Sequence, residues 1–383
     1  MQLMKRISSP SRHFGVAVVA VAVGLLASGS AYADIKLGVA GPITGPQAAF
    51  GEQLERGVEQ AVEDINAVGG VLGQKISVEV GDDVADPKQG VSVANKFVGE
   101  GVTWVVGHFN SGVTIPASDV YLDNNIVMVT PSATNPALTE KGSKWNVFRT
   151  CGRDDQQGDV AAKFIAAAFR DKKVAVLHDK TTYGRGLADA TIASLAKSGV
   201  KPVLYEGVNA GEKDYLAIVS KVKAAGADVV YWGGTYPEGG LIRRQMSDQG
   251  VTAPMMGGDG LADSEFAAIS GPAAEGTLMT FGSDPTKKPS ATAIVKEFMA
   301  KAFDPQAYTL YSYAAVQVLA QAAEAAKSTD PKKMAEVMHS GKPFHTVLGD
   351  LAYDKKGDLI ESDYVMYTWK KTAEGKITYV ENK

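Results

Sequence analysis

Six glycine-rich loops hold most of the side chains that could bind or transform a small molecule. Each loop follows a short run of β-forming residues, and together they combine glycines, hydroxyl groups and single aromatic rings. The loops are residues 41–50, 107–112, 130–134, 178–183, 233–236 and 257–260. Glycines let backbone N–H groups approach a ligand, hydroxyl groups offer hydrogen bonds, and an aromatic ring offers an apolar wall. The loops therefore predict recognition of a small polar molecule.

Sequence motifs of the common enzyme classes are missing. The sequence contains no G-x-x-x-x-G-K-[ST] loop, no G-x-G-x-x-G after the first predicted strand, no H-E-x-x-H and no G-x-S-x-G. The histidines after residue 33 are far apart in sequence, and no carboxylate or histidine cluster has the spacing of metal ligands. The sequence predicts a binding protein, not an enzyme, with no cofactor and no metal.

Three features have a catalytic alternative. Cys151 could be a nucleophile, but a lone cysteine is more often a small buried apolar residue. His178 and Asp179 could be a catalytic pair, although a structural turn is the better interpretation. The pair Asp82-Asp83 could bind a metal ion, but after a strand such residues more often cap the following helix. We expect a structural role for all three.

The first 33 residues have the features of a cleaved secretory signal peptide. Three basic residues come first, residues 14–26 are uncharged and apolar, and residues 31–33 are an Ala-Tyr-Ala cleavage site. An uncleaved anchor is the alternative, but the apolar run is shorter than the roughly 20 residues that a spanning helix needs. No cysteine follows it that could carry a lipid. We expect cleavage before Asp34 and a periplasmic product with no membrane insertion.

Charge and length limit the class of the mature protein. Removing the leader takes away three of the 39 basic residues and none of the 43 acidic ones, which leaves a formal charge of about −7. This charge argues against nucleic acid or an anionic membrane surface as partner. About 350 residues exceed what one hydrophobic core usually supports, so two domains are expected. With one cysteine, no internal disulfide can form.

Short strands and helices alternate in two successive series. In the first, strands are predicted at 35–39, 76–80, 103–106 and 126–129, and helices at 51–68, at 87–98 and before the last strand. In the second, helices are predicted at 157–169, 186–197, 215–225 and 238–249, and strands at 173–177, 202–205, 228–232 and 253–256. Helices return at 291–303, 309–327 and 331–339, and β segments at 348–352 and 364–369 close the chain. This order predicts an α/β fold with parallel sheets covered by helices on both faces.

Short motifs recur in a fixed order over most of the mature chain. They are residues 57–70 (GVEQAVEDINAVGG), Asp82-Asp83 with 86–89 (DPKQ) and 93–96 (VANK), Gly107-His108 with 116–119 (PASD), Thr130-Pro131, 155–158 (DQQG), 178–180 (HDK) with Tyr183-Gly184, and 210–214 (AGEKD). Each motif is weak alone. In their shared order they resemble the leucine/isoleucine/valine-binding protein family of periplasmic amino-acid-binding proteins, which serve ABC importers.

The resemblance implies a type I periplasmic binding protein, with two Rossmann-like α/β lobes that have parallel sheets and are joined by three hinge crossovers. It places residues 34–152 and 282–361 in lobe 1 and residues 153–281 and 362–383 in lobe 2, after the signal peptide at 1–33. The ligand would be a free amino acid, small or aliphatic, which is trapped when the lobes close. The partner would be the permease of an ABC transporter, and the protein is expected to be a monomer.

The resemblance also implies a set of ligand-binding residues: Phe50, Phe109, Ser111, Ser132, Ala133, Thr134, Tyr183, Thr235, Asp259 and Tyr308. Ser111 and Thr134 would bind the α-carboxylate, and Ser111 begins a helix whose dipole favours an anion. The Ser132 carbonyl and the Asp259 carboxylate would accept from the α-ammonium, because an unpaired ammonium trapped between lobes is costly. Tyr183 would close over the ligand from lobe 2. Asp259 could instead be a turn carboxylate in its Gly-Gly-Asp-Gly loop.

Departures from the family's pattern bear on specificity. Thr235 stands where the family often has a tyrosine, with Tyr236 beside it. Phe109 replaces what is often a leucine, and Phe50 and Tyr308 are expected to line the same pocket, although each could be core. If the rings project inward, leucine would overpack the pocket at a cost of about 1–3 kcal/mol. We expect a preference for compact ligands such as alanine, valine, proline or a short ω-amino acid.

Three other functions are alternatives. A protein of this fold could bind an amide, urea, an aromatic acid or another small organic acid, but such a ligand would not need both an anion site and Asp259. A periplasmic sensor that feeds a receptor could carry the same residues. A secreted hydrolase would turn over the amino acid that it binds.

Overall fold

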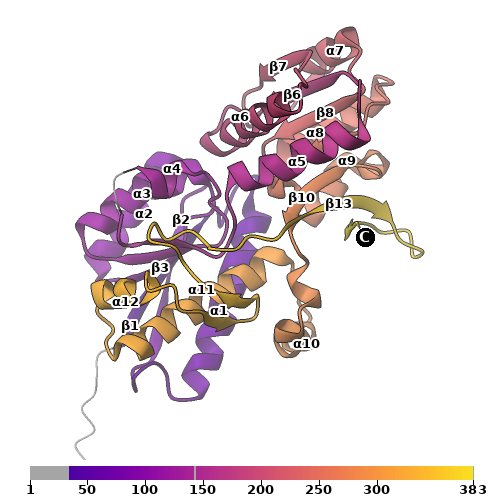
Figure 1. Ribbon diagram of the computed structural model, residues 1–383. Helices are drawn as coiled ribbons and strands as arrows, with labels where there is room; N and C mark the ends of the chain where they lie inside the picture. Colours follow the sequence, from indigo (N-terminus) through magenta and orange to yellow (C-terminus); the bar gives the residue numbers. More distant parts are fainter. Residues whose placement is uncertain (1–33, 142–143, 383) are drawn as a thin grey trace, which may run out of the picture. The chain divides into compact units, whose positions relative to one another are not determined.

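Two β-sheets organise the chain, which a computed structural model describes at residues 34–141 and 144–382 (Figure 1). The predicted signal peptide, residues 1–33, lies outside the described residues. Residues Asp34–Lys383 cluster as one compact unit. Among the helices that are described, none is both long enough and apolar enough to cross a membrane.

The first sheet has five parallel strands in the order β2-β1-β3-β4-β5. The strands are β1 (Ile35–Gly41), β2 (Ile76–Asp82), β3 (Trp104–Gly107), β4 (Val127–Thr130) and β5 (Val147–Arg149). Side chains alternate between two apolar faces, with Leu37 and Val39 on one face and Ala40 and Val105 on the other. Such a sheet is stable only when helices cover both faces.

Helices from two distant parts of the chain cover the first sheet. On one face lie α1 (Ala48–Ala67) and α11 (Ala307–Ala326), and on the other α2 (Pro87–Glu100) and α3 (Ser111–Asp123). Around them are α4 (Ala137–Glu140), α10 (Thr292–Ala300), α12 (Pro331–Met338) and the small β11 (Phe344–Thr346)–β12 (Gly349–Leu351) hairpin. We call this sheet and its helices the first lobe.

The second sheet has seven strands in the order β14-β13-β10-β9-β8-β6-β7. The strands are β6 (Val174–His178), β7 (Leu204–Gly207), β8 (Val229–Gly233), β9 (Met255–Gly257), β10 (Leu278–Gly282), β13 (Tyr364–Lys371) and β14 (Ile377–Glu381). β6 to β10 are parallel, but β13 and β14 pair antiparallel. The expectation of parallel sheets therefore holds for this sheet except at the C-terminal hairpin, which a short turn can join only in antiparallel pairing.

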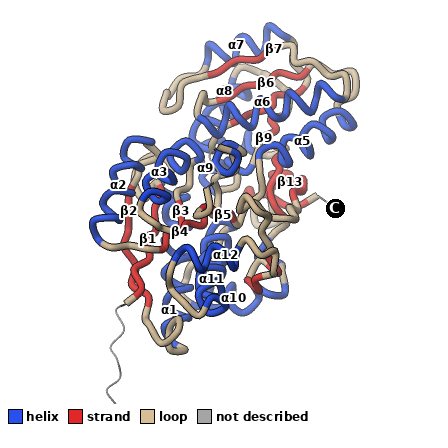
Figure 2. Tube along the Cα trace, turned by 60° about the vertical axis from the view of Figure 1, so that its left-hand side comes forward, coloured by secondary structure: helices blue, strands red, loops and turns tan. Residues whose placement is uncertain are grey.

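Helices also cover both faces of the second sheet, and Figure 2 shows blue helices along its red strands. One face carries α5 (Asp154–Ala168) and α6 (Thr182–Lys197), and the other α7 (Leu216–Ala225), α8 (Tyr236–Asp248) and α9 (Ser264–Ser270). Short 3-10 turns follow: η1 (Asp259–Leu261), η2 (Gly271–Ala274), η3 (Pro285–Lys287) and η4 (Pro289–Ala291). We call this sheet and its helices the second lobe.

Three connections join the lobes. The chain crosses at residues 150–153 between β5 and α5, at 283–291 between β10 and α10, and at 352–363 between β12 and β13. Two α/β lobes with three crossovers confirm the fold class that the sequence predicts. The sequence did not predict strands β5, β10, β11 and β14. Three helices begin two to four residues earlier than predicted: α5, α6 and α8.

The predicted helix cap at Asp82-Asp83 is wrong. The cap of α2 is Asp86, whose carboxylate accepts from the backbone N–H groups of Lys88 and Gln89, both at 2.9 Å. Two residues with positive φ follow Asp83 and separate it from the helix. Asp83 instead pairs with a histidine in the core, as described below.

Candidate functional site

The predicted ligand-binding loops come together at the carboxyl ends of strands from both sheets. Ser111 begins α3 after β3, residues 132–134 follow β4, Tyr183 lies in the first turn of α6, and Asp259 begins η1 after β9. All of these residues are buried. The Asn135 side chain donates to the Thr182 carbonyl at 3.0 Å, which joins the loop after β4 to the start of α6. This edge is the usual ligand position in α/β sheets.

The loop after β4 presents one free carbonyl, one free N–H group and one free hydroxyl. The Ala133 carbonyl accepts from Arg149, and the Thr134 carbonyl accepts from the Asp154 backbone N–H at 3.0 Å. Within the described residues, no hydrogen bond reaches the Ser132 carbonyl, the Thr134 N–H or Thr134 Oγ1. Buried polar groups are almost always paired, so three unpaired groups in one loop make it a candidate for contact with a ligand.

Ser111 offers a donor for an anion at the start of α3. Its Oγ accepts from the Asn135 backbone N–H at 3.2 Å, so the hydroxyl proton is still free to be donated. The first N–H groups of a helix have no partner inside the helix, and the helix dipole adds positive potential there. Ser111 and the free Thr134 N–H together form the kind of arrangement that binds a carboxylate.

Asp259 is a buried acid of the candidate site. Its carboxylate accepts from the Tyr183 hydroxyl at 2.7 Å and from the Tyr308 hydroxyl at 3.0 Å. Burial raises the pKa of Asp259 above its ordinary value, and the hydrogen bonds from the two tyrosines only partly offset this. A cation placed beside Asp259 would favour its charged form, so the carboxylate is suited to accept from an ammonium group.

Sequence reasoning missed two buried polar side chains beside these residues. Asp154 is fully buried, and no hydrogen bond in the described residues reaches either carboxylate oxygen. Burial raises its pKa to about 8, with the nearby Thr134 hydroxyl lowering it and Asp259 raising it. Gln157 is also fully buried and has an unpaired side-chain oxygen. Both lie in the stretch 154–158, whose polar run could have indicated a site because it opens a buried helix.

Four aromatic rings pack against one another next to the polar groups. Phe50 stacks on Phe109 with ring centroids 4.2 Å apart, and Tyr308 meets the Phe109 ring edge-on at 4.9 Å. Tyr236 packs edge-on against Phe50 at 4.9 Å. Thr235 is directed elsewhere, because its hydroxyl is 3.4 Å from a Glu238 oxygen. The neighbouring tyrosine therefore contributes the ring from the second lobe, a residue that the sequence noted without assigning a contact.

Hydrogen bonds between the lobes surround this cluster. The Gln53 amide donates to Asp263 of the second lobe at 2.7 Å, and within its own lobe it accepts from the Tyr308 backbone N–H at 3.1 Å. The Tyr236 hydroxyl donates to the Pro46 carbonyl at 3.0 Å. Burial raises the pKa of Asp263 to about 6, against the opposing effect of its hydrogen bonds. The first lobe thus contacts the second through α1 and α11.

The features with catalytic alternatives have structural partners. Asp179 accepts from the Thr181 N–H at 2.9 Å and His178 Nδ1 accepts from the Lys180 N–H at 3.0 Å, so the pair forms a turn, as predicted. Burial raises the pKa of Asp179 to about 6. In the described residues, no group of three His, Cys, Asp or Glu side chains is arranged to hold a metal ion.

Asp83 and Cys151 are part of the interior. Asp83 lies 2.7 Å from His108 Nδ1, and His108 Nε2 lies 2.8 Å from the Tyr121 hydroxyl, with all three side chains fully buried. Cys151 is a free, buried cysteine, and burial raises the pKa of its thiol. It lines a cavity of about 230 Å³ at the connections, which Asp259 also borders. A thiol with a raised pKa is a poor nucleophile, in agreement with the predicted buried role.

Known proteins resemble this chain over nearly its whole length. The sequence profile of a periplasmic binding protein family matches residues 34–376. A protein of Brucella suis named Leu/Ile/Val-binding protein homolog 1 is 56% identical over 363 residues, which cover 95% of this chain and 98% of that protein. A protein of Pseudomonas aeruginosa named amino acid binding protein is 52% identical over 358 residues, with 93% and 95% covered.

Solved structures share the fold. A leucine-binding protein of Thermotoga maritima is 29% identical with a TM-score of 0.82, covering 90% of this chain and 97% of that one. The branched-chain amino acid transporter substrate-binding protein LivJ of Streptococcus pneumoniae, in complex with isoleucine, is 26% identical with a TM-score of 0.80, covering 91% and 100%. The chain therefore belongs to the periplasmic binding protein family, among the Leu/Ile/Val-binding protein homologues.

Proposed function

We propose that this protein captures a free amino acid in the periplasm and delivers it to the permease of an ABC transporter. One observation carries the proposal: free hydrogen-bond acceptors and free hydrogen-bond donors lie in the same buried site. The Ser132 carbonyl and the Asp259 carboxylate are acceptors for an ammonium group. The Ser111 hydroxyl and the Thr134 N–H are donors for a carboxylate. An α-amino acid zwitterion satisfies both sets, and charge-assisted hydrogen bonds are worth about 1.5–3 kcal/mol each.

The relatives support this chemistry and this location. The Streptococcus pneumoniae protein holds isoleucine, and a 28% identical substrate-binding protein of Desulfitobacterium hafniense is described in complex with leucine. The family is one of periplasmic binding proteins, and residues 1–33 have the composition of a signal peptide. We propose that the predicted lobes, 34–152 with 282–361 and 153–281 with 362–383, are the units that close on the ligand.

The aromatic cluster supports a compact ligand. Phe50, Phe109, Tyr236 and Tyr308 fill space on one another, and all four are buried. Leucine would have to displace at least one ring, at a cost of about 1–3 kcal/mol. We therefore propose that alanine or valine binds more tightly than leucine. A dissociation constant near micromolar, or about 8 kcal/mol, would allow capture and release.

Calorimetric titration of the ligand-free mature protein tests the proposal. We expect alanine and valine to bind near micromolar, leucine to bind more weakly, and alaninamide and benzoate not to bind. Asp259→Ala and Asp259→Asn should both lose at least tenfold in affinity. Asp179→Asn is the matched control, because Asp179 is equally buried in the second lobe but its carboxylate accepts from Thr181 and from neither of the tyrosines that bind Asp259.

Other outcomes would assign the alternatives. Leucine as the tightest ligand would overturn the compact-ligand proposal. Loss of binding in Asp259→Ala but not in Asp259→Asn would indicate an amide, urea or organic acid. Benzoate binding would point to an aromatic acid, since a solute-binding protein of R. palustris with 20% identity and a TM-score of 0.82 holds 4-hydroxybenzoate on the same fold. Turnover of a bound amino acid would indicate a hydrolase.

A further inference from the structure

One guanidinium group binds two carbonyls of the loop after β4. The Arg149 side chain donates through Nη1 to the Ala133 carbonyl and through Nη2 to the Asn135 carbonyl at 3.0 Å. These carbonyls lie on either side of Thr134, whose own carbonyl is held by the Asp154 N–H. Because three consecutive peptide groups are fixed, the free Ser132 carbonyl and the free Thr134 N–H have fixed directions as well.

Arg149 needs a counterion, and Asp358 supplies it. The Arg149 side chain is fully buried, and its Nε donates to Asp358 Oδ1 at 2.7 Å. Burial alone would raise the pKa of Asp358, but Arg149 and Arg153 more than offset it and hold the pKa below its ordinary value. Asp358 lies in a tight turn, and its backbone N–H donates to Asp354 Oδ1 at 3.0 Å. A buried cation without such a partner is strongly unfavourable.

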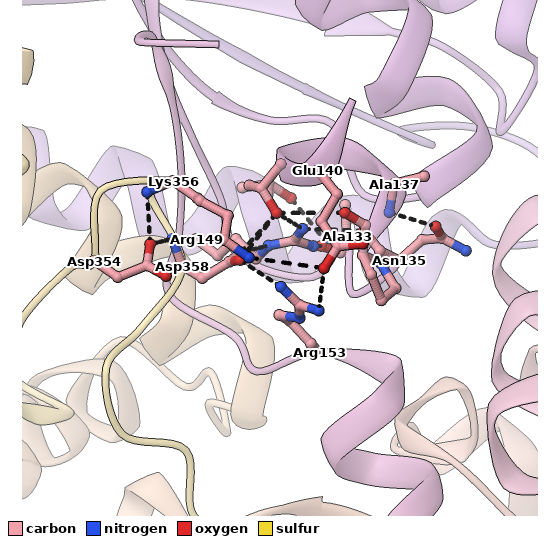
Figure 3. A network of polar contacts seen from close by, with 12 residues as sticks. Ala133, Asn135, Ala137, Glu140, Arg149, Arg153, Asp354, Lys356 and Asp358 are labelled. Atoms are coloured by element: carbon pink, nitrogen blue, oxygen red, sulfur yellow. Dashed lines mark hydrogen bonds and ion pairs between the residues drawn. The ribbon is translucent and has the colours of Figure 1, made fainter. Parts of the chain in front are cut away.

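A second arginine reaches the same carboxylate from the first connection. Arg153 lies at the end of residues 150–153, and its Nη1 donates to Asp358 Oδ2 at 2.8 Å. Its Nη2 donates to Glu140 Oε1 at 2.7 Å. Figure 3 shows the two guanidinium groups meeting at Asp358, beside the loop that carries Ala133 and Asn135. Asp358 belongs to the third connection, so this network links two of the three crossovers to the ligand-binding loop.

We propose that Asp358 is a positioning residue, which couples the loop at 132–135 to the connections between the lobes through Arg149 and Arg153. Asp358 does not contact the ligand. When the connections change their angle, the carboxylate and both arginines move together, and the Ser132 carbonyl and Thr134 N–H are realigned with them. The inference rests on the proposed function, because it assumes that this loop contacts the ligand.

The test uses two variants and one matched control in the mature protein. Arg153→Gln removes the link to the first connection at a side chain that is partly exposed, so the variant is expected to fold. Asp358→Asn keeps the shape of the side chain and removes its charge. Lys356→Gln is the control, because Lys356 lies in the same turn and pairs with Glu140, but at 3.8 Å and half exposed.

Two measurements are made on each variant. Hydrogen exchange of the ligand-free protein reports on the amides of Ala133 and Asn135, which donate to Thr130 Oγ1 and Ser111 Oγ. Calorimetry with alanine and valine reports on affinity, and small-angle X-ray scattering reports on the change in radius of gyration when they bind. Melting of the ligand-free protein separates a loss of stability from a loss of positioning.

Both variants should exchange these amides faster, bind alanine and valine about tenfold more weakly, and contract less on binding, whereas Lys356→Gln should match the wild type. A merely structural role would lower the melting temperature and leave the dissociation constant of the folded protein unchanged. Affinity within twofold of the wild type in both variants, or unchanged exchange in both, overturns the inference. If the wild type binds neither amino acid, the proposed function fails, and exchange alone still decides whether Asp358 holds the loop.

Discussion

The Tyr308 hydroxyl donates to Asp259 Oδ2 at 3.0 Å, although the tyrosine belongs to α11 of the first lobe and the aspartate to the loop after β9 of the second. Tyr183 donates to the other carboxylate oxygen at 2.7 Å from within the second lobe. One carboxylate therefore receives a hydroxyl from each lobe. The bond between lobes forms at the acid that we propose for ammonium recognition, so the proposed ligand contact and the contact between the lobes share one residue.

Removing the Tyr308 hydroxyl should weaken amino acid binding. Tyr308→Phe deletes a hydrogen bond to a charged group, worth about 1.5–3 kcal/mol, so the dissociation constant is expected to rise at least tenfold. Calorimetry with valine measures it. Tyr313→Phe is the control, because Tyr313 lies on the same helix and donates to Asp64 at 2.6 Å, away from the site. Equal affinities for the two variants would contradict a role of Tyr308 in the site.

Binding should release a proton from Asp259 at any pH where the free protein keeps this carboxyl protonated. The pKa of Asp259 is raised by burial in the free protein, and a bound ammonium favours the carboxylate. Protonated Asp259 must lose its proton before it accepts from the ammonium, so affinity should increase as the pH rises through this raised pKa. Titrations in buffers of different ionisation enthalpy count the protons released. Asp259→Asn should release none, and wild-type affinity that does not vary with pH would be inconsistent with this role.

Replacing Asp154 should change how stability depends on pH. Its pKa is raised from 3.8 to about 8, so the folded state favours the neutral acid. The contribution of this group to the free energy of unfolding is complete below pH 3.8. It decreases by roughly 1.4 kcal/mol per pH unit as the pH rises, until the folded-state pKa of about 8 is passed. Asp154→Asn carries no charge, so its free energy of unfolding should rise relative to the wild type between pH 5 and 8.5.

Urea denaturation at several pH values measures this difference for Asp154→Asn. Asp155→Asn is the control, because the neighbouring Asp155 is half exposed and hydrogen bonds from Arg153 lower its pKa despite some burial. The contribution of Asp155 is complete above its unfolded pKa of 3.8, so the control should be less stable than the wild type by a constant amount between pH 5 and 8.5. Parallel curves for Asp154→Asn and the wild type would show that this buried carboxyl titrates normally.

A smaller residue at position 109 should shift the preference toward larger ligands. Phe109→Leu removes one of the two stacked rings at the site and opens space beside Phe50. The ratio of leucine affinity to alanine affinity is expected to rise about tenfold, since relief of overpacking is worth about 1–3 kcal/mol. Phe97→Leu makes the same change in the core between the first sheet and α2. It should lower stability and leave the ratio unchanged.

Local sequence patterns predicted most of the fold. The apolar spacing in residues 51–68 marks α1, and alternation of short apolar runs with helices marks both sheets. The sequence did not predict β10, because its five residues follow a 3-10 turn and form a strand by pairing with β9 and β13. The cap of α2 at Asp86 was misplaced for a related reason, since the turn at Val84 and Ala85 has no clear sequence signal.

The sequence by itself determined the class of the protein and the loops that meet at the strand ends, because periodicity, turn residues and motif order are local properties. Only the tertiary structure decided which polar groups in those loops are free. Arg149 binds the Ala133 carbonyl and leaves the Ser132 carbonyl available, and the pKa of Asp154 is raised because packing removes water from its carboxyl group. Hydrogen-bond pairing and burial depend on residues distant in sequence, so no local pattern encodes them.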